Sequence, residues 1–200
     1  MSKIAVLSRD TVDKIAAGEV VERPSSVVKE LTENAIDAGA DAVTVEIRDG
    51  GTSLIRITDN GSGIEADEVR TAFLPHATSK ISTADDLERI ASLGFRGEAL
   101  PSICAVSRME VITRSRSALE GVRLCMEGGT EKSFEIIGAP EGSTFIVRDL
   151  FYNTPARKKF LKSAASEAGL ISDLAEHLAL SHPEISMKLI INGQVRLHTS

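Results

Sequence analysis

The sequence predicts an α+β fold in which one mixed, mostly antiparallel sheet is covered on one face by helices. Helical patterns dominate the early part of the 200 residues, and adjacent strand patterns dominate later. The order is not a strict β-α-β alternation. A hairpin predicted at 186–199 adds an antiparallel pair, because Asn192-Gly193 is a typical two-residue hairpin turn.

The first predicted elements are two helices. The stretch 9–20 predicts a short helix that ends near Gly18. A second helix is predicted over 23–39, with Pro24 in its first turn and Gly39 just past its end. The predicted buried stripe of this second helix comprises Val27, Val28, Leu31, Ala35 and Ala38.

The next stretches alternate between strands and helices. The stretches 42–47 and 53–59 alternate like half-buried strands, joined by a turn at 48–51, and a short helix is predicted over 65–73. The remaining predictions are a loop at 74–83, helices at 83–94 and 97–106, strands at 109–115, 121–127, 132–137 and 143–149, and a long helical region at 156–182.

The composition is typical of a globular protein of the cytoplasm. No apolar run approaches the roughly 20 residues of a membrane helix, and the first residues lack the apolar region of a secretory signal. Cys104 and Cys125 form no CxxC pair and are typical of core residues in a reduced compartment. We therefore expect a cytoplasmic protein with no membrane partner. The net charge of −6 argues against a nucleic-acid binder that uses its whole surface, but not against a local basic patch.

One face of the helix predicted over 23–39 carries Glu30, Glu33, Asn34 and Asp37, at spacings i, i+3, i+4 and i+7. No lysine or arginine belongs to this set, so like charges repel along the face. Asp37 also lies near a helix C-terminus, where the macrodipole disfavours an anion. Either the face is solvated, or a hard cation such as Mg²⁺ offsets the repulsion, with an amide oxygen as ligand and a carboxylate polarising an attacking water.

Glycine-rich stretches supply three candidate loops for ligand binding. Asp59 ends a predicted strand before Asn60-Gly61-Ser62-Gly63, and either accepts a hydrogen bond from an exocyclic amine or forms an ordinary Asx turn. The stretch 94–100 is either a phosphate-binding helix start or a plain loop. The third, Gly142-Ser143-Thr144, opens a strand and offers hydroxyl groups.

Two further stretches are candidates for binding phosphate groups. The predicted loop 74–83 is long enough to be a lid over a ligand. The stretch 156–162 contains four basic residues, which either attract the phosphates of DNA or another partner, or lie in solvent at a helix start. The pattern GxxxxGK[ST] is absent from the sequence, which excludes a P-loop NTPase.

Together these motifs resemble those of the GHKL ATPases, which include DNA gyrases, heat-shock chaperone ATPases and histidine kinases. The matching motifs are ELTENAIDAG, DNGSGI, ATSKI, GFRGEAL and the strand opening GST. Within this group, the stretches 14–40, 77–100 and 149–162 resemble the MutL family of DNA mismatch repair proteins. The likeness covers nearly the whole chain, and it implies the Bergerat fold, an α/β sandwich that binds ATP beneath a mobile lid.

The resemblance implies that Glu30 is the catalytic base acting on the hydrolytic water, and that Asn34 ligates Mg²⁺. Glu33 and Asp37 are expected to have structural or supporting roles.

For adenine, the resemblance implies recognition of the exocyclic amine by Asp59, with Gly61 and Gly63 leaving room for the ring and Thr144 close to it. The other ATP-binding residues that it implies form the lid and the phosphate loop, and they are Thr78, Ser79, Lys80, Gly94, Phe95, Arg96, Gly97, Glu98, Ala99 and Leu100.

The resemblance also implies a slow ATPase that works as a switch in mismatch repair. ATP would close the lid and pair two copies of the domain, and hydrolysis would reset them. The implied partners are a MutS-type mismatch recognition protein and, weakly, DNA. Members of the family continue into a second domain, which supplies a lysine to the γ-phosphate, and into a C-terminal domain. Residues 1–200 are therefore expected to be the ATPase domain of a longer protein, with weak turnover alone.

Three alternatives differ in class. A kinase catalytic domain of the same superfamily would need a phospho-accepting histidine domain and a later GxGLG-type loop, and the sequence has neither. An interaction domain that kept the fold without the chemistry is disfavoured by the intact Glu30, Asn34 and Asp59. A nicotinamide dinucleotide binder is disfavoured because no clean β-α-β unit surrounds the glycines at 61–63.

Overall fold

The computed structural model describes residues 17–18, 20–75, 77 and 98–200 of the chain. The expected lid residues Thr78, Ser79 and Lys80 lie outside these residues, and so do the expected phosphate-loop residues Gly94, Phe95, Arg96 and Gly97. The helix predicted over 83–94 and most of the helix predicted over 9–20 also lie outside them.

One eight-stranded sheet forms the frame of the molecule, in the order β5-β4-β3-β6-β2-β1-β7-β8. Neighbouring strands are antiparallel, except that β1 and β7 run parallel, so the predicted mixed, mostly antiparallel sheet is confirmed. The strands are β1 (Ala42–Arg48), β2 (Leu54–Asp59), β3 (Arg108–Arg114), β4 (Gly121–Glu127), β5 (Thr130–Ile137), β6 (Gly142–Arg148), β7 (Ser186–Ile191) and β8 (Gln194–His198).

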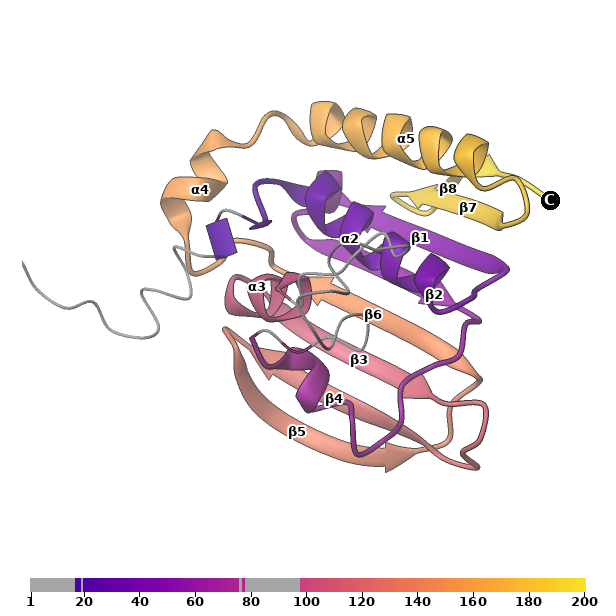
Figure 1. Ribbon diagram of the computed structural model, residues 1–200. Coiled ribbons are helices and arrows are strands. Elements are labelled where there is room, and N and C mark those ends of the chain that lie inside the picture. The colour runs from indigo at the N-terminus through magenta and orange to yellow at the C-terminus, as the bar shows by residue number, and fades with distance from the viewer. Residues whose placement is uncertain (1–16, 19, 76, 78–97) are drawn as a thin grey trace, which may run out of the picture.

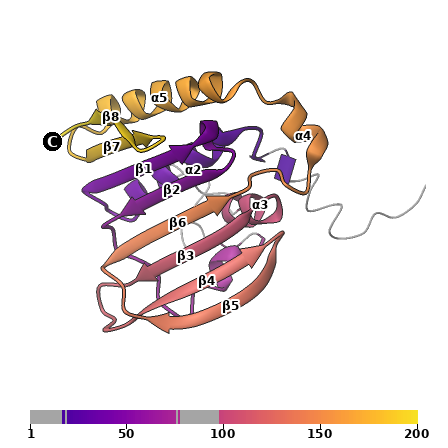
Figure 2. The same ribbon diagram turned by 180° about the vertical axis from the view of Figure 1, so that it is seen from behind.

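Helices cover one face of this sheet and leave the other face open, as the front and back views show (Figure 1, Figure 2). Helix α2 (Pro24–Asp37) contacts β1 and β2, and α5 (Ala164–Ser181) contacts α2 and β7. The shorter α3 (Ala99–Ala105) contacts β3 and β4. The predicted layer of helices on one face is therefore also confirmed.

The helical region predicted at 156–182 is interrupted, which corrects the sequence interpretation. Helix α4 (Pro155–Phe160) ends before Leu161, and α5 begins after Ser163. The Ser163 hydroxyl accepts a hydrogen bond from the backbone N–H of Ser166 at 3.2 Å, so it caps the new helix. A cap of this kind was present in the sequence, but the continuous helical pattern around it obscured it.

The helix predicted over 65–73 is a second correction, because the structure has a turn there followed by the 3-10 helix η2 (Thr71–Phe73). A stretch this short gains little from helix formation alone. Side-chain contacts fix it instead. Val69 and Phe73 are buried, and Arg70 forms two hydrogen bonds to Glu131 of β5 and stacks on Phe134 at 3.9 Å.

The hydrophobic core lies between the helices and the inner face of the sheet. Val27 and Leu31 of α2 pack there with Val45, Ile57 and Val111 of the strands, and each of these side chains is at most 1% exposed. Burial of this apolar surface provides the main stabilisation of the fold.

The buried part of α2 extends further around the helix than predicted. Four of the five predicted stripe residues are buried, but Ala38 is only half-buried. Thr32 and Glu33 are buried instead. Because α5 packs against α2, this helix has a second neighbour besides the sheet, which a single-stripe interpretation does not include.

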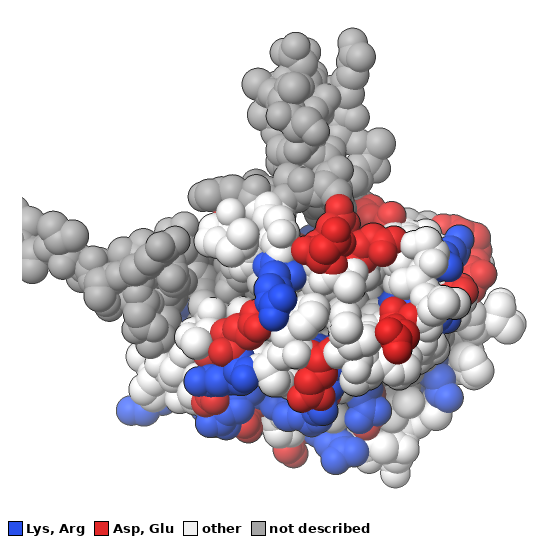
Figure 3. Space-filling view, turned by 90° about the horizontal axis from the view of Figure 1, so that it is seen from below, with Lys and Arg blue, Asp and Glu red and all other residues white. Residues whose placement is uncertain are grey.

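Charged side chains cover the open face of the sheet in pairs. Arg56 of β2 contacts Glu46 of β1 at 3.0 Å, and Arg123 of β4 contacts Glu110 of β3 at 2.7 Å. Seen from the β5 side, basic and acidic side chains are interspersed (Figure 3). Within the described part of the chain, no helix is both long enough and apolar enough to cross a membrane.

Candidate functional site

Asp59 is the last residue of β2, and alternation along the strand turns its side chain toward the helix-covered face. It is only 7% exposed. Its Oδ1 atom accepts hydrogen bonds from the backbone N–H of Gly61 at 2.9 Å and of Ser143 at 3.3 Å. Burial raises the pKa of Asp59, and the two backbone hydrogen bonds oppose this shift. Asp59 is thus a fixed, largely dehydrated acceptor at a strand end.

Asp59 belongs to a row of polar side chains across three strand ends. Ser143 of β6 is paired with Asp59 on one side and with Thr113 of β3 on the other. The hydroxyl groups of Thr113 and Ser143 are 2.9 Å apart, and the Thr113 hydroxyl accepts a hydrogen bond from the Ile64 backbone N–H at 3.0 Å. All three row residues are at most 8% exposed. The strand ends therefore provide a preorganised polar row beneath the loop at 60–64.

Thr144, the predicted adenine neighbour, lies on the other face of the sheet from Asp59. Its hydroxyl is 3.2 Å from that of Thr58, its register partner on β2. Because side chains alternate between faces, the residue of β6 beside Asp59 is Ser143. The sequence contained the signal for this placement, since Asp59 and Ser143 occupy inward positions of paired strands, but the pairing register was not known.

Three glycines let the backbone approach closely around this row. Gly63 has φ +69°, and a Cβ there would overlap the backbone of Arg114 and Ser115. Gly142 has φ +95°, and a Cβ there would overlap the carbonyl oxygen of Asp59. At Gly61, a Cβ would lie 2.9 Å from the Ala38 carbonyl oxygen. Side chains at these positions would push apart the elements that form the site.

The C-terminal end of α2 lies directly against this loop. The backbone N–H of Ser62 donates to the carbonyl oxygen of Ala38 at 2.9 Å. Asn60 joins the same loop to the start of β1, because its Oδ1 accepts from the backbone N–H groups of Asp41 and Ala42 at 3.1 and 3.0 Å. The sequence interpretation gave Asn60 no role. These bonds fix the helix that carries Glu30 and Asn34 relative to Asp59.

The acidic face of α2 is less uniform than its sequence suggests. Glu30 and Asn34 are half-buried and Asp37 is exposed, whereas Glu33 is only 7% exposed. The Glu33 carboxylate pairs with Lys29 at 3.4 Å, so a cation does neutralise part of this face. Lys29 is not one of the four residues of this face, but it precedes Glu33 by one helical turn and so reaches its carboxylate. Glu33 thus has a structural ion pair.

Of the expected phosphate loop, the structure describes only Glu98, Ala99 and Leu100. Glu98 is the residue before α3, and Ala99 and Leu100 form its first turn, which confirms the predicted helix start. All three are half-buried, and α3 contacts α2. The two helices therefore lie next to each other on the covered face of the sheet (Figure 1).

The donor atoms on α2 are too few for a metal site made of protein alone. Among the residues that the structure describes, no three His, Cys, Asp or Glu side chains come together as a metal site. The half-buried pair Glu30 and Asn34 supplies oxygen atoms one helical turn apart. Such a set suits Mg²⁺, which usually takes one or two protein oxygens and completes its shell with water and ligand phosphates.

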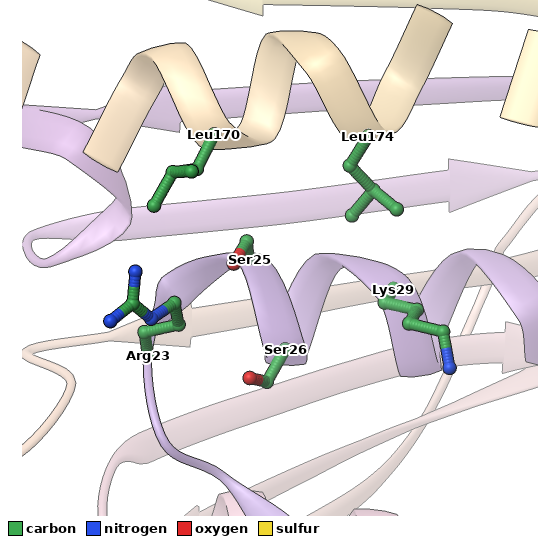
Figure 4. A pocket seen from close by; sticks show the side chains of 6 residues that line it. All are labelled: Arg23, Ser25, Ser26, Lys29, Leu170 and Leu174. Carbon is green, nitrogen blue, oxygen red and sulfur yellow. The ribbon is translucent and has the colours of Figure 1, made fainter. Parts of the chain in front are cut away.

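A shallow cavity of about 220 Å³ lies between α2 and α5 (Figure 4). Leu170 and Leu174 point into it from α5, and the polar residues Arg23, Ser25, Ser26 and Lys29 of the α2 side complete its lining. None of the expected site residues lines it. This cavity therefore does not mark the candidate site.

Comparison with protein families gives a match to the histidine kinase-, DNA gyrase B- and HSP90-like ATPase model over residues 22–141. This range includes α2, the Asp59 loop and α3. Among curated proteins, the DNA mismatch repair protein MutL of Agathobacter rectalis is 64% identical over all 200 residues, which correspond to 31% of its length. The MutL of Desulforudis audaxviator is 54% identical over all 200 residues, or 35% of its length. The chain thus spans about a third of these relatives.

Solved structures give a consistent result. The Aquifex aeolicus MutL ATPase domain complexed with ADP matches with a TM-score of 0.73 and 35% identity, over 90% of this chain and 65% of that one. The N-terminal domain of a DNA repair protein matches with a TM-score of 0.79 and 30% identity, over 94% of this chain and 56% of that one.

Proposed function

Because this chain belongs to the histidine kinase-, DNA gyrase B- and HSP90-like ATPase family and matches MutL mismatch repair proteins over its full length, we propose that it binds ATP and hydrolyses it slowly. In this proposal, residues 1–200 are the ATPase domain of a mismatch repair protein. The Aquifex aeolicus MutL ATPase domain, which is 35% identical to this chain, was solved in complex with ADP, and this supports nucleotide binding.

The observation that carries the proposal is the setting of Asp59. Its Oδ1 atom is already occupied by two backbone N–H groups, and its Oδ2 atom accepts no hydrogen bond from the described residues. A free acceptor oxygen on a largely buried carboxylate favours a ligand that donates a hydrogen bond, such as the exocyclic amine of adenine. Ser143 lies beside it and is a better candidate than Thr144 for a second contact to the base.

The loop glycines have a separate role in this proposal. An added Cβ at Gly61 would lie 3.1 Å from Asp59 Oδ1, so the lack of a side chain there would leave room for a flat ring beside the carboxylate. Gly63 would support the same space indirectly, because it lets the loop pack against the backbone of Arg114. The strand ends therefore select the base, and they do so with groups that need not move when the ligand arrives.

The helix side of the site would supply the chemistry. Glu30 would take the proton of the attacking water as a general base, and Asn34 would orient a metal ion through its amide oxygen. Mg²⁺ bound with the nucleotide would neutralise charge on the phosphates. Glu98, Ala99 and Leu100 would border the phosphates with the backbone at the start of α3, and Thr78, Ser79, Lys80 and the stretch Gly94–Gly97 would complete the lid and loop.

At the level of the cell, the proposal is a nucleotide-dependent switch. ATP binding would close the lid and favour a homodimer, and hydrolysis would reverse both changes. The proposed partners are a MutS-type mismatch recognition protein and DNA, the latter bound weakly by this part of the protein. We propose a cytoplasmic location for this repair role.

The experiment that tests the function compares adenine and guanine nucleotides. Calorimetric titration of the chain with a non-hydrolysable ATP analogue and with its GTP counterpart, both with Mg²⁺, measures the preference for the base. Guanine presents a carbonyl oxygen where adenine presents an amine, so its acceptor would face the acceptor of Asp59. We expect at least roughly a hundredfold preference for the adenine nucleotide. Equal affinities, or tighter binding of NAD, would contradict the proposal.

A further inference from the structure

The Arg157 side chain contacts the main chain just before α2. Its Nη1 atom donates a hydrogen bond to the carbonyl oxygen of Val21 at 3.0 Å. Its guanidinium group also lies against Gly18, where a Cβ would overlap it. The next residues of α4, Lys158 and Lys159, are exposed, and they form no ion pair with the described residues. Arg157 is thus distinguished from its basic neighbours by a specific contact to the backbone.

The turn that Arg157 holds leads directly into α2. The backbone N–H of Val21 donates to the carbonyl oxygen of Ala17 at 2.7 Å, and both side chains are fully buried. Arg23 is the N-cap residue of α2, and its side chain makes no capping hydrogen bond. The entry of α2 is therefore fixed by contacts from outside the helix, among them that of Arg157 and the packing of Pro24 against Gly51.

The segment that ends in Arg157 also holds the C-terminal end of α3. The backbone N–H of Phe151 donates to the carbonyl oxygen of Val106 at 2.7 Å, and the Asn153 side chain donates to that of Ala105 at 2.8 Å. We call residues 149–157 the clasp segment. In both ribbon views it runs from the end of β6 to α4, past α3 and the short turn before α2 (Figure 1, Figure 2).

The clasp segment is held in an unusual backbone conformation. Asp149 has φ +51° and Phe151 has φ +65°, and residues other than glycine rarely adopt such positive φ angles. Phe151 is fully buried, and Leu150 donates its backbone N–H to the carbonyl oxygen of Thr52 at 2.9 Å. Such backbone persists only where the surroundings strongly determine it. A segment this tightly determined can transmit a fixed geometry between the two helices that it contacts.

We propose that Arg157 is a positioning residue, which sets α2 relative to α3 through the clasp segment. This inference rests on the proposed nucleotide site, because its consequence is the placement of Glu30 and Asn34 of α2 relative to α3, which α2 contacts. Arg157 itself would touch neither nucleotide nor metal. Arg157 would keep the site groups of α2 in a fixed position relative to those of α3. Small displacements of such groups can reduce binding and the reaction rate strongly.

The test uses four single variants of this chain: Arg157→Ala, Arg157→Lys, Gly18→Ala and the control Lys158→Ala. Calorimetry measures the affinity for ADP in EDTA and again in Mg²⁺, and hydrogen exchange measures the protection of the α2 amides. The strand-end part of the site does not depend on Arg157, whereas the metal-binding part on α2 does. The ratio of the two affinities therefore separates a positioning role from a general loss of structure.

For Arg157→Ala, we expect ADP affinity in EDTA to stay within about threefold of the wild type, while the gain from Mg²⁺ falls roughly tenfold. The first amides of α2 should exchange faster. Arg157→Lys should recover part of both effects, since a lysine can still donate to Val21. Gly18→Ala should displace the guanidinium and give a similar result. A fifth protein that combines Gly18→Ala with Arg157→Ala should be no worse than Arg157→Ala alone, because both changes remove the same contact.

Two results would overturn the inference. One is that Arg157→Ala matches Lys158→Ala in both the Mg²⁺ gain and the exchange of α2. The other is an equal loss of affinity in EDTA and in Mg²⁺, which would indicate a general structural defect. If the wild type binds no ADP under either condition, the proposed function fails by itself. The exchange of α2 in Arg157→Ala against Lys158→Ala then still decides whether the clasp positions this helix.

Discussion

The two sides of the candidate site are built in different ways. On the strand side, Asp59, Ser143 and Thr113 are buried and joined by hydrogen bonds in one row across three strands. On the helix side, Glu30 and Asn34 are half-buried side chains on a single surface of α2. The strand side depends on backbone register and on glycines, and the helix side depends on the identity of a few side chains.

This difference indicates how each side responds to change. A rigid strand end can select a base without rearrangement, because its acceptor and its close backbone contacts are already in place. The helix side instead depends on where α2 is held, because this one helix carries both the proposed general base, Glu30, and the proposed metal ligand, Asn34. Substitutions on the strand side should therefore affect folding and affinity, and those on the helix side should affect turnover.

The largest effect is expected on the helix side, from Glu30→Gln. Loss of the proposed general base should lower the rate of phosphate release by roughly 10²- to 10⁴-fold, while affinity for ATP changes little, because the base acts only in the reaction. Phosphate release and calorimetric titration measure the two quantities. Glu22→Gln, at an exposed position before α2, is the matched control. Unchanged turnover in Glu30→Gln would remove the helix side from the mechanism.

The next effect is on folding and belongs to the strand side. Gly63→Ala would place a side chain in a backbone conformation with φ +69° and against the backbone of Arg114, so we expect it to lower the free energy of unfolding by about 3 kcal/mol or more. Gly169→Ala, in α5 with open space around its Cβ position, should instead stabilise the protein by about 0.5–1 kcal/mol. Denaturant unfolding followed by circular dichroism measures both. Similar stabilities for the two variants would show that the backbone at 63 is not tightly held.

Asp59→Asn should separate stability from binding. The amide can keep both backbone hydrogen bonds but presents an N–H₂ group where the carboxylate presented an acceptor, so ADP affinity should fall roughly 10- to 100-fold. Measurement of ADP binding by calorimetry decides this point. Undiminished affinity would mean that Asp59 does not bind the base.

The same variant has a defined dependence on pH. Burial raises the pKa of Asp59 in the folded state above its value in the unfolded state, so the folded state holds this proton more tightly. The folded state therefore loses stability as the pH rises from the unfolded-state pKa to the higher folded-state pKa. Asp59→Asn avoids this loss. Its unfolding free energy relative to the wild type should therefore be higher at neutral pH than at a pH below about 3.9, the ordinary pKa of an aspartate. An opposite trend would show that hydrogen bonding outweighs burial at this site.

The smallest expected effect distinguishes the two faces of β6. Ser143→Ala should weaken ADP binding by roughly fivefold, because one neutral hydrogen bond is lost beside the base. Thr144→Val, on the opposite face, should leave affinity unchanged. Titration of both variants under one condition gives the comparison directly. A reversed order would restore Thr144 as the neighbour of the base.

Much of this fold could be predicted from the sequence, because the patterns are local. The alternating strands, Pro24 and Gly39 at the ends of α2, and the Asn192-Gly193 turn all have short-range causes, and the structure has each of them. The interruption at Leu161–Ser163 was missed because a good helical pattern lies on both sides of it. The turn at 65–70 was missed because its contacts, such as Arg70 with Glu131, join distant parts of the chain.

The candidate site was less predictable where it depends on pairing between strands. The motifs predicted Asp59 and the glycines at 61 and 63, because these residues follow one another within a few positions of the sequence. They did not reveal that Ser143 is the residue beside Asp59, because that follows from the β2–β6 register across a separation of 84 residues. Asn60 and Arg157 were also missed as anchors, since their partners lie on other elements.

In this proposal, one site combines a strand side that selects the nucleotide base with a helix side that depends on the metal ion. The most direct test is a calorimetric titration of ADP into this chain, first in EDTA and then in Mg²⁺. We predict measurable binding in EDTA, carried by Asp59 and its neighbours, and tighter binding in Mg²⁺, carried by α2. Binding that is absent in both conditions, or that is the same with and without Mg²⁺, would contradict this account.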